Sequence, residues 1–332
     1  MTGLERIRRA VLFERVDHTP VAPLLGAHAA ALAGLGHDRA CRDAGVQAEA
    51  LLHAVEAYEP DAIFTLMDLS AEPEALGAGV ASEEGQPPVV VRHLTREDLE
   101  TERLEQRILT SRVPVFIETV SRLRAALGDS VCIGALISGP LTATANAVGI
   151  ADLARMLRRD REGITGLLDR LTDACVALQK SHAEAGAHAV VILEPVATTA
   201  ILGPADLEAL LLPRLQAVTE AARRLGLISI LHVCGDCRRS LPLLARAGAH
   251  ALSLDSPVEM TSAREIVGTR SALMGNLDVL RLLPYGRPEE VRRAVRDLIA
   301  PMPRGFILSS GCELPEQTPR ANVAEMIAAA RR

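Results

Sequence analysis

Residues 228–237 read ISILHVCGDC, and residues 305–312 read GFILSSGC. Each stretch is an apolar run of strand length that stops at small residues and at side chains able to bind a metal. The first carries His232 and Cys234, and the second carries Cys312. One imidazole and two thiols suit Zn²⁺, which accepts nitrogen and sulfur ligands and keeps a fourth position open in catalytic sites. The two stretches therefore predict a catalytic zinc centre at the ends of two strands.

The two cysteines are separated by 78 positions in the chain. Structural zinc sites usually draw their ligands from two close pairs, so here the fold has to bring the ligands together. The alternative is that these residues stand near strand ends by chance, because a free cysteine is often only a small buried apolar side chain. The choice between the two depends on where the fold places the strand ends.

Apolar runs of strand length alternate with helical patterns along the chain, as is typical of a parallel sheet covered by helices on both faces. Eight runs predict an α/β fold, a single (β/α)₈ TIM barrel domain over residues 1–332, with extra N-terminal helices. A small excursion over 72–100 follows the second strand. An open doubly wound sheet is the alternative, but it does not bring the ends of the fifth and eighth strands together. The runs are Val21–Leu25, Asp61–Met67, Ser130–Ile137, Ala187–Leu193, the run from Ile228 to His232, Ala249–Leu254, Ser271–Gly275 and Gly305–Ser309.

Functional residues of such barrels sit at the C-terminal ends of the strands. Glu194 is expected to be a fourth metal ligand, with a local cap or ion pair as the alternative. Asp255 is expected to accept the proton of the unbound His232 nitrogen, with pairing to an arginine as the alternative. Asp255 and the other polar or small residues that follow the runs are expected to bind the substrate or to shape its pocket; the others are His28, Asp68, Gly139 and Asn276.

The remaining cysteines are expected to lie outside the metal centre. Cys237 forms a CxxC pattern with Cys234, which is also the pattern of a thioredoxin-like redox pair. Because the surrounding sequence predicts a barrel strand, we expect Cys237 to be a bystander at the start of the following helix. Cys41, Cys132 and Cys175 fall in helix or strand patterns and are expected in the core.

Composition excludes several classes of function. A net charge of −6 and 2% aromatic residues argue against a nucleic-acid groove, which needs a basic surface and stacking rings. The chain has no apolar run of the roughly 18 residues that a membrane span needs. The N-terminus mixes charged and apolar residues and does not resemble a signal peptide. We therefore expect a cytoplasmic protein with reduced thiols.

Six segments carry a resemblance to a known family. They are VDHTPV (16–21), MDLSAEPEALGA (67–78), SGPLT (138–142), HVCGD (232–236), MGNLD (274–278) and GFILSSGCELPEQTP (305–319). With them the sequence resembles the uroporphyrinogen decarboxylase superfamily over nearly its whole length, and within it the methylcobalamin:coenzyme M methyltransferase branch. The resemblance assigns the zinc ligands of that branch to His232, Cys234 and Cys312.

The resemblance implies a zinc-dependent transfer of a methyl group from a methylated corrinoid to a thiol such as coenzyme M. The chain has no D-x-H-x-x-G motif, so methylcobalamin is expected to arrive on a separate corrinoid protein. A decarboxylase-type lyase is one alternative, but the arginine-rich segment typical of the decarboxylases has no counterpart in Pro23–Leu32, which contains no arginine. A non-catalytic corrinoid- or tetrapyrrole-binding accessory protein is another. The sequence leaves open the acceptor, which includes other thiols or a folate, and also any homo-oligomer.

Overall fold

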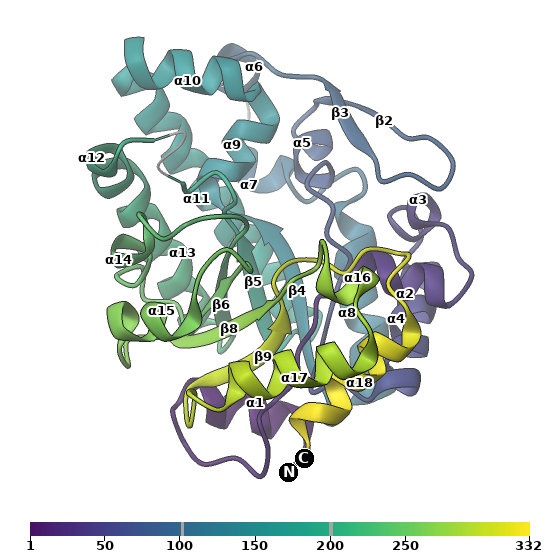
Figure 1. Cartoon of the computed structure of the whole chain (residues 1–332). Helices are drawn as coiled ribbons and strands as arrows, with labels where there is room; N and C mark the ends of the chain where they lie inside the picture. Colours follow the sequence, from purple (N-terminus) through teal and green to yellow (C-terminus); the bar gives the residue numbers. More distant parts are fainter. Residues whose placement is uncertain (101–102, 199–201) are drawn as a thin grey trace.

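The centre of the molecule is a curled sheet of seven parallel strands in the part of the chain that the computed structural model describes, residues 1–100, 103–198 and 202–332 (Figure 1). The sheet order is β1-β4-β5-β6-β7-β8-β9, so each strand pairs with the next strand of the same sheet along the chain. This arrangement confirms the predicted α/β class and is consistent with a TIM-like barrel. The strands are β1 (Ala62–Phe64), β4 (Cys132–Ser138), β5 (Ala189–Leu193), β6 (Ile228–Val233), β7 (Ala251–Leu254), β8 (Ala272–Leu277) and β9 (Phe306–Ser310).

Helices connect successive strands and lie around the outside of the sheet (Figure 1). The first helix begins at a capping box, in which Thr2 and Glu5 satisfy each other's backbone amides. The helices are α1 (Gly3–Val11), α2 (Gly26–Leu32), α3 (His37–Ala40), α4 (Ala44–Tyr58), α5 (Ala71–Ala75), α6 (Arg96–Glu100), α7 (Leu104–Arg107), α8 (Val113–Leu127), α9 (Pro140–Val148), α10 (Ile150–Arg159), α11 (Arg161–Glu184), α12 (Pro204–Asp206), the π-helical turn η1 (Leu207–Leu211), α13 (Leu212–Arg224), α14 (Leu241–Leu244), α15 (Met260–Val267), α16 (Leu282–Tyr285), α17 (Pro288–Ile299) and α18 (Arg320–Ala330).

The first predicted strand, Val21–Leu25, is wrong as a strand. It forms one isolated parallel bridge, between Val21 and Leu308 of β9. Pro23 has no N–H for a ladder, and the amide of Leu24 binds the Ser310 hydroxyl instead of a carbonyl. On the other side, the carbonyl of Val21 accepts the amide of Asp61, which precedes β1. The segment therefore contacts both edge strands without satisfying the hydrogen-bond pattern of a strand.

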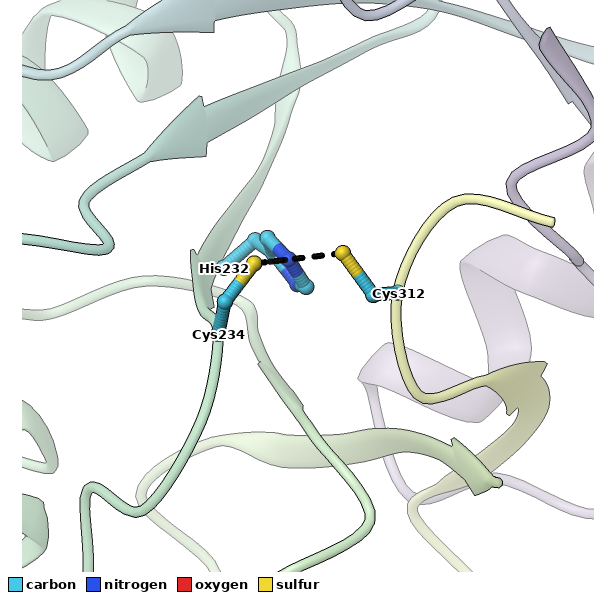
Figure 2. A group of neighbouring side chains, drawn as sticks. All are labelled: His232, Cys234 and Cys312. Atoms are coloured by element: carbon cyan, nitrogen blue, oxygen red, sulfur yellow. Dashed lines mark hydrogen bonds between the residues drawn. The ribbon is translucent and has the colours of Figure 1, made fainter. Parts of the chain in front are cut away.

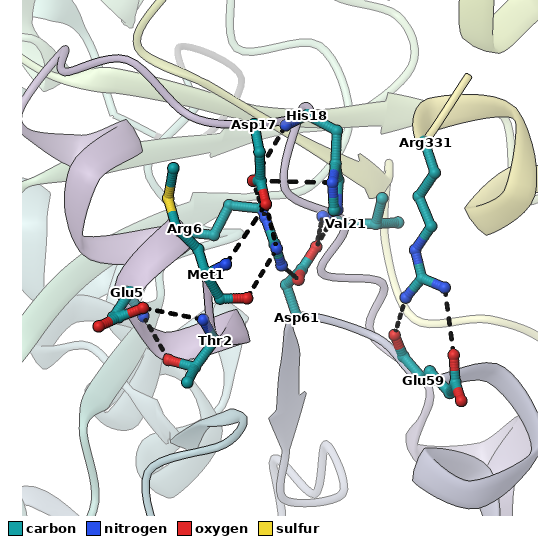
Figure 3. Close-up of polar contacts among 10 residues, drawn as sticks. All are labelled: Met1, Thr2, Glu5, Arg6, Asp17, His18, Val21, Glu59, Asp61 and Arg331. Atoms are coloured by element: carbon teal, nitrogen blue, oxygen red, sulfur yellow. Dashed lines mark hydrogen bonds and ion pairs between the residues drawn. The ribbon is translucent and has the colours of Figure 1, made fainter.

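A buried polar network holds this segment and α1 against the sheet (Figure 3). Arg6 of α1 forms ion pairs with Asp61 and with Asp17, at 2.6 Å for the Asp17 contact. The other carboxylate oxygen of Asp61 accepts the amide of Val21 at 2.7 Å. The hydrogen bond from Arg6 also holds the pKa of Asp17 well below its usual range. One guanidinium thus links the first helix, the Val21 segment and the start of β1.

Successive side chains of each strand point to opposite faces of the sheet, so the sheet has one apolar core on each face. Residues such as Val191, Ile230 and Met274 belong to an inner cluster that includes Leu4 and Ile7 of α1. The alternate residues, such as Ile192 and Leu231, belong to the larger cluster under the helices. The same alternation decides which side chains at the strand ends face inward.

The excursion after the second predicted strand contains a short two-stranded sheet. β3 (Val89–Arg92) pairs in antiparallel register with β2 (Gly79–Ala81), away from the main sheet (Figure 1). Among the described residues, no helix combines the length and the apolar character needed to cross a membrane.

Candidate metal centre

His232 ends an alternating row of side chains on β6. Ile228 and Ile230 belong to the inner cluster, and the strand repeat puts His232 on the same face. The residue is fully buried. Its Nε2 lies 2.9 Å from the sulfur of Cys234, and its Nδ1 lies 2.9 Å from the hydroxyl oxygen of Ser253. The imidazole therefore lies between a thiol and a hydroxyl, with Nε2 on the side of the cysteines.

The two predicted cysteine ligands meet beside this imidazole (Figure 2). Cys234 follows β6, Cys312 follows β9, and their sulfurs lie 3.2 Å apart. One ligand atom from each of His232, Cys234 and Cys312 lies within 4.8 Å of the other two. The curled sheet thus brings together three side chains from two distant segments, as the barrel prediction required.

The donor set fits a zinc ion. With metal–ligand bonds of about 2.0–2.3 Å, neighbouring ligand atoms of a tetrahedral site lie roughly 3.3–3.8 Å apart. Two sulfurs bound to one zinc ion belong at the upper end of this range, so the two sulfurs, now 3.2 Å apart, would move apart by about half an ångström to hold the ion. Two sulfurs and one nitrogen also match the ligand preference of zinc and leave one coordination position for another donor.

The two thiols differ in acidity because they share one hydrogen bond. That bond from Cys234, helped by the imidazole of His232, lowers the pKa of the Cys312 thiol against the opposing effect of burial. The same bond and burial raise the pKa of Cys234. Cys312 is therefore the sulfur that ionises first, and a metal ion would have to displace the proton that remains on Cys234.

Glu194 follows β5, and its carboxylate binds the start of α9. It accepts hydrogen bonds from the amides of Leu141 and Thr142, at 2.9 and 3.1 Å, and from the Thr142 hydroxyl at 2.8 Å. Burial raises the pKa of Glu194 to about 7 despite these bonds. The local capping role considered for this residue is therefore present, and metal ligation by Glu194 stays a prediction.

Gly139 is required by the position of that carboxylate. A Cβ atom at residue 139 would lie 2.4 Å from an oxygen of Glu194. The predicted role of Gly139 in shaping the site therefore has a steric reason, which is the close approach of Glu194 to the turn between β4 and α9.

The prediction that Asp255 supports His232 is wrong. Ser253 lies beside His232 in the parallel register of β6 and β7, so its hydroxyl reaches the ring nitrogen. Asp255 lies beyond the end of β7, and its carboxylate accepts the amides of Gly235 and Ser256 at 2.8 and 2.6 Å. Asp255 thus holds the loop that carries Cys234 and does not contact the imidazole through a hydrogen bond.

Two further candidates make contacts with helices. His28 is buried, and its Nε2 lies 2.9 Å from the hydroxyl of Tyr58 in α4. Asp68 pairs with the buried guanidinium of Arg112 and accepts the hydroxyl of Ser70 at 2.6 Å. Both side chains serve internal packing in this structure, and their contact with substrate remains a prediction.

Asn276 lies within β8, which is longer than the predicted Ser271–Gly275 strand. Its side-chain amide donates to the carbonyls of Asp255 and Val258 at 2.9 and 2.7 Å. Asn276 also borders a surface groove of about 650 Å³ beside α17. Its expected shape-setting role therefore has a physical basis, because it ties β8 to the loop after β7.

The other cysteines are buried, but Cys237 lies in the loop before α14 and not at the start of a helix as predicted. Cys237 is buried and precedes α14, and it is not part of the metal-ligand group found among the described residues. Burial raises the pKa of its thiol to about 12, which makes it a poor nucleophile. Cys41, Cys132 and Cys175 are buried in the core.

Two carboxylates at this end of the sheet were missed in the sequence. Glu72 accepts the amide and hydroxyl of Ser138, and burial raises its pKa to about 7. Glu313, next to Cys312, accepts the amides of Ala27 and Met67, and burial raises its pKa to about 8. Both lie in motifs that carry the family resemblance, which was the available signal. Nothing in their immediate sequence separates them from exposed acids.

The uroporphyrinogen decarboxylase (URO-D) family model matches residues 2–332. The chain belongs to the uroporphyrinogen decarboxylase family. A methylated-thiol–coenzyme M methyltransferase from Methanosarcina mazei is 28% identical over 100% of this chain and 89% of its own length. A methylcobamide:CoM methyltransferase from Methanosarcina acetivorans is 28% identical over 84% of this chain and 81% of its own.

Members of this family with other names are similar to the chain as well. A uroporphyrinogen decarboxylase from Syntrophotalea carbinolica is 29% identical over 86% of this chain and 84% of its own. Among solved structures, a methyltransferase from Methanosarcina mazei superposes with a TM-score of 0.92 at 24% identity, covering 99% of this chain and 98% of its own. That similarity establishes the fold, and the activity has to be argued from the site.

Proposed function

We propose that this protein is a zinc-dependent methyltransferase that moves a methyl group from a methylated corrinoid to a thiol such as coenzyme M. The observation that carries the proposal is the meeting of His232, Cys234 and Cys312 within 4.8 Å. The names of the two Methanosarcina relatives, which act on coenzyme M, support the same chemistry. The corrinoid would be carried by a separate protein, since the chain has no corrinoid motif of its own.

In this proposal His232, Cys234 and Cys312 hold the zinc, and Glu194 supplies a fourth ligand in the resting enzyme. Zinc, when bound, supplies the positive charge that lets a thiol lose its proton at neutral pH. The strand ends hold the ligand side chains in place, and Asp255 fixes the loop of Cys234 through the Gly235 amide. The His232 side chain is fully buried and therefore shielded from water. These residues would thus hold an acceptor sulfur at the C-terminal ends of the strands.

A decarboxylase reaction is the second candidate, because uroporphyrinogen decarboxylases are among the relatives. A porphyrin substrate carries many carboxylates and calls for several arginines. The segment Pro23–Leu32 contains no arginine, and most of it forms the alanine-rich helix α2, whose residues are largely buried. Methyl transfer is therefore the better-supported activity.

We further propose that the chain is one TIM-like barrel domain, in which the segment around Val21 closes the gap between the two edge strands of the seven-stranded sheet. Support comes from the contacts of this segment with both edge strands. A cytoplasmic location and a corrinoid protein that docks over the C-terminal ends of the strands complete the proposal. A thiol is the proposed small-molecule partner.

Metal analysis of protein purified without added metal tests the centre, and turnover of methylcobalamin with a small thiol tests the reaction. We expect one zinc per chain, and Cys312→Ala is expected to lose both zinc and activity. Cys237→Ala is the matched control, because this buried cysteine lies outside the ligand group, and it is expected to retain both. Full zinc binding by Cys312→Ala would contradict the site. Zinc binding without turnover would favour the accessory-protein alternative.

A further inference from the structure

We propose that Ser253 is a positioning residue for the metal centre, and this inference rests on the zinc function proposed above. Its hydroxyl holds the His232 ring in the tautomer whose Nε2 lone pair is directed at the ligand position beside the cysteines. Ser253 lies outside the six segments that carry the family resemblance.

The register of two strands creates this contact. His232 of β6 lies opposite Ser253 of β7, and both residues are fully buried. Ala251 belongs to the same inner cluster as Ile230, so the strand repeat directs Ser253 and His232 to the same face. The resulting Nδ1–Oγ distance is 2.9 Å. Because it is built on backbone pairing, the contact is fixed independently of any metal ion.

The hydrogen bond selects a tautomer. A neutral imidazole has one N–H donor and one acceptor nitrogen. When Nδ1–H donates to the Ser253 hydroxyl oxygen, Nε2 is left as the acceptor, and Nε2 is the nitrogen that lies 2.9 Å from the Cys234 sulfur. Without this partner in a buried site, the ring would lose both its orientation and its preference for that tautomer. Partners of this kind typically change metal affinity by 10- to 100-fold.

A serine in this position keeps the site neutral on the imidazole side. The neighbouring carboxylate, Asp255, is engaged by the amides of Gly235 and Ser256. The ligand set already includes two thiols that become negative on binding zinc, so a neutral hydroxyl orients the ring without adding a further negative charge. Ser253 therefore holds His232, and Asp255 holds the loop that carries Cys234.

The same two strands provide a matched control. At their opposite ends, the hydroxyl of Ser229 at the start of β6 lies 2.9 Å from Nδ1 of His250, which precedes β7. Ser229 is also fully buried. Ser229→Ala also removes a buried hydroxyl beside a histidine ring, here one that accepts the His250 amide at 3.2 Å as well, and it does so at the opposite end of the same two strands from the cysteines.

Zinc affinity of the full-length protein tests the inference, measured by competition with a chromophoric chelator. We expect Ser253→Ala to bind zinc at least about tenfold more weakly than the parent. Ser253→Thr keeps the hydroxyl and is expected to stay within about threefold of the parent. Ser229→Ala is expected to match the parent. The absorption spectrum of cobalt-loaded protein, which reports ligand geometry, is expected to change in Ser253→Ala and not in Ser229→Ala.

Equal zinc affinity in Ser253→Ala and the parent would overturn the role of Ser253 and leave the proposed methyltransferase intact. Equal weakening in Ser253→Ala and Ser229→Ala would also overturn it, because the effect would then come from general loss of stability. If the parent itself bound no zinc, the proposed function would fail first, so the two failures are distinguishable.

Discussion

Thr142 donates both its backbone amide and its hydroxyl to one carboxylate oxygen of Glu194, at 3.1 and 2.8 Å. This pair links the strand that precedes Glu194 to the helix that follows the neighbouring strand. Because Glu194 is fully buried, the bonds replace the water that its carboxylate would otherwise bind. The position of the Glu194 carboxylate therefore depends on α9 as well as on β5, the strand that precedes it.

Thr142→Val is expected to destabilise the metal-free protein at pH 8 by about 1–2 kcal/mol more than Thr144→Val, because a hydroxyl is lost from a buried charged acceptor. Thr144 is the control, since its hydroxyl donates to the carbonyl of Pro140 in the same helix. Urea unfolding measures both. At pH 5 the difference is expected to shrink, because the pKa of Glu194 is raised to about 7 and its carboxyl is then neutral. Equal losses in the two variants at pH 8 would refute this account.

Glu72→Gln is expected to flatten the pH dependence of stability. Burial raises the pKa of Glu72 from an ordinary 4.5 to about 7. Between these values the folded state holds more protons than the unfolded state, so stability is full below about pH 4.5 and falls as pH rises to about 7. Because glutamine does not ionise, the variant is expected to avoid a loss of up to about 3 kcal/mol in the free energy of unfolding over this pH range. Unfolding curves from pH 4.5 to 8 measure the change.

The control for this variant is Glu49→Gln, at an exposed position of α4. It is expected to leave the profile of stability against pH unchanged. The same slope in Glu72→Gln and in the parent would show that Glu72 keeps an ordinary acidity in the folded protein.

Arg6→Met is expected to cost about 3–5 kcal/mol of stability, because it leaves the buried carboxylate of Asp61 without its cation. Arg8→Met, at an exposed position of the same helix, is the control and is expected to cost less than about 0.5 kcal/mol. Denaturant unfolding compares them. Adding Asp61→Asn to Arg6→Met should restore part of the loss, and a purely additive result would argue against an ion pair of this importance.

Binding of a thiol to the zinc-loaded protein is expected to release about one proton when the pH lies below the thiol's pKa, because the sulfur joins the metal as thiolate. Calorimetric titrations at one pH in two buffers of different ionisation enthalpy give the number of protons. Metal-free protein is the control and should show no such release. Thiol binding without proton release would exclude coordination of the acceptor sulfur.

Docking of a methylated corrinoid protein is expected to protect the loops after the main-sheet strands from hydrogen exchange, since the cobalt has to approach Cys234 and Cys312. The Arg6 network holds the start of β1 and so lies at the opposite end of the sheet from the cysteines; it provides the internal control (Figure 3). Protection confined to that end would contradict docking over the metal centre.

The sequence by itself determined the strands of the main sheet and singled out the three side chains proposed as metal ligands. Apolar runs bounded by glycine, proline and polar residues predicted all seven strands of the main sheet, and His232, Cys234 and Cys312 were identifiable because their side chains have few other reasons to follow strand ends together. These signals are local, since alternation and spacing are properties of short segments.

Tertiary structure decided what depends on register and burial. The register of β6 against β7 decides that Ser253, and not Asp255, reaches His232. The sequence pattern of either strand does not reveal this register. The segment around Val21 has the composition of a strand, yet Pro23 and the Asp61 carboxylate divert its hydrogen bonds. The acidities of Glu72, Glu194 and Glu313 depend on the loss of water around each carboxyl group, which only the packing of distant segments produces.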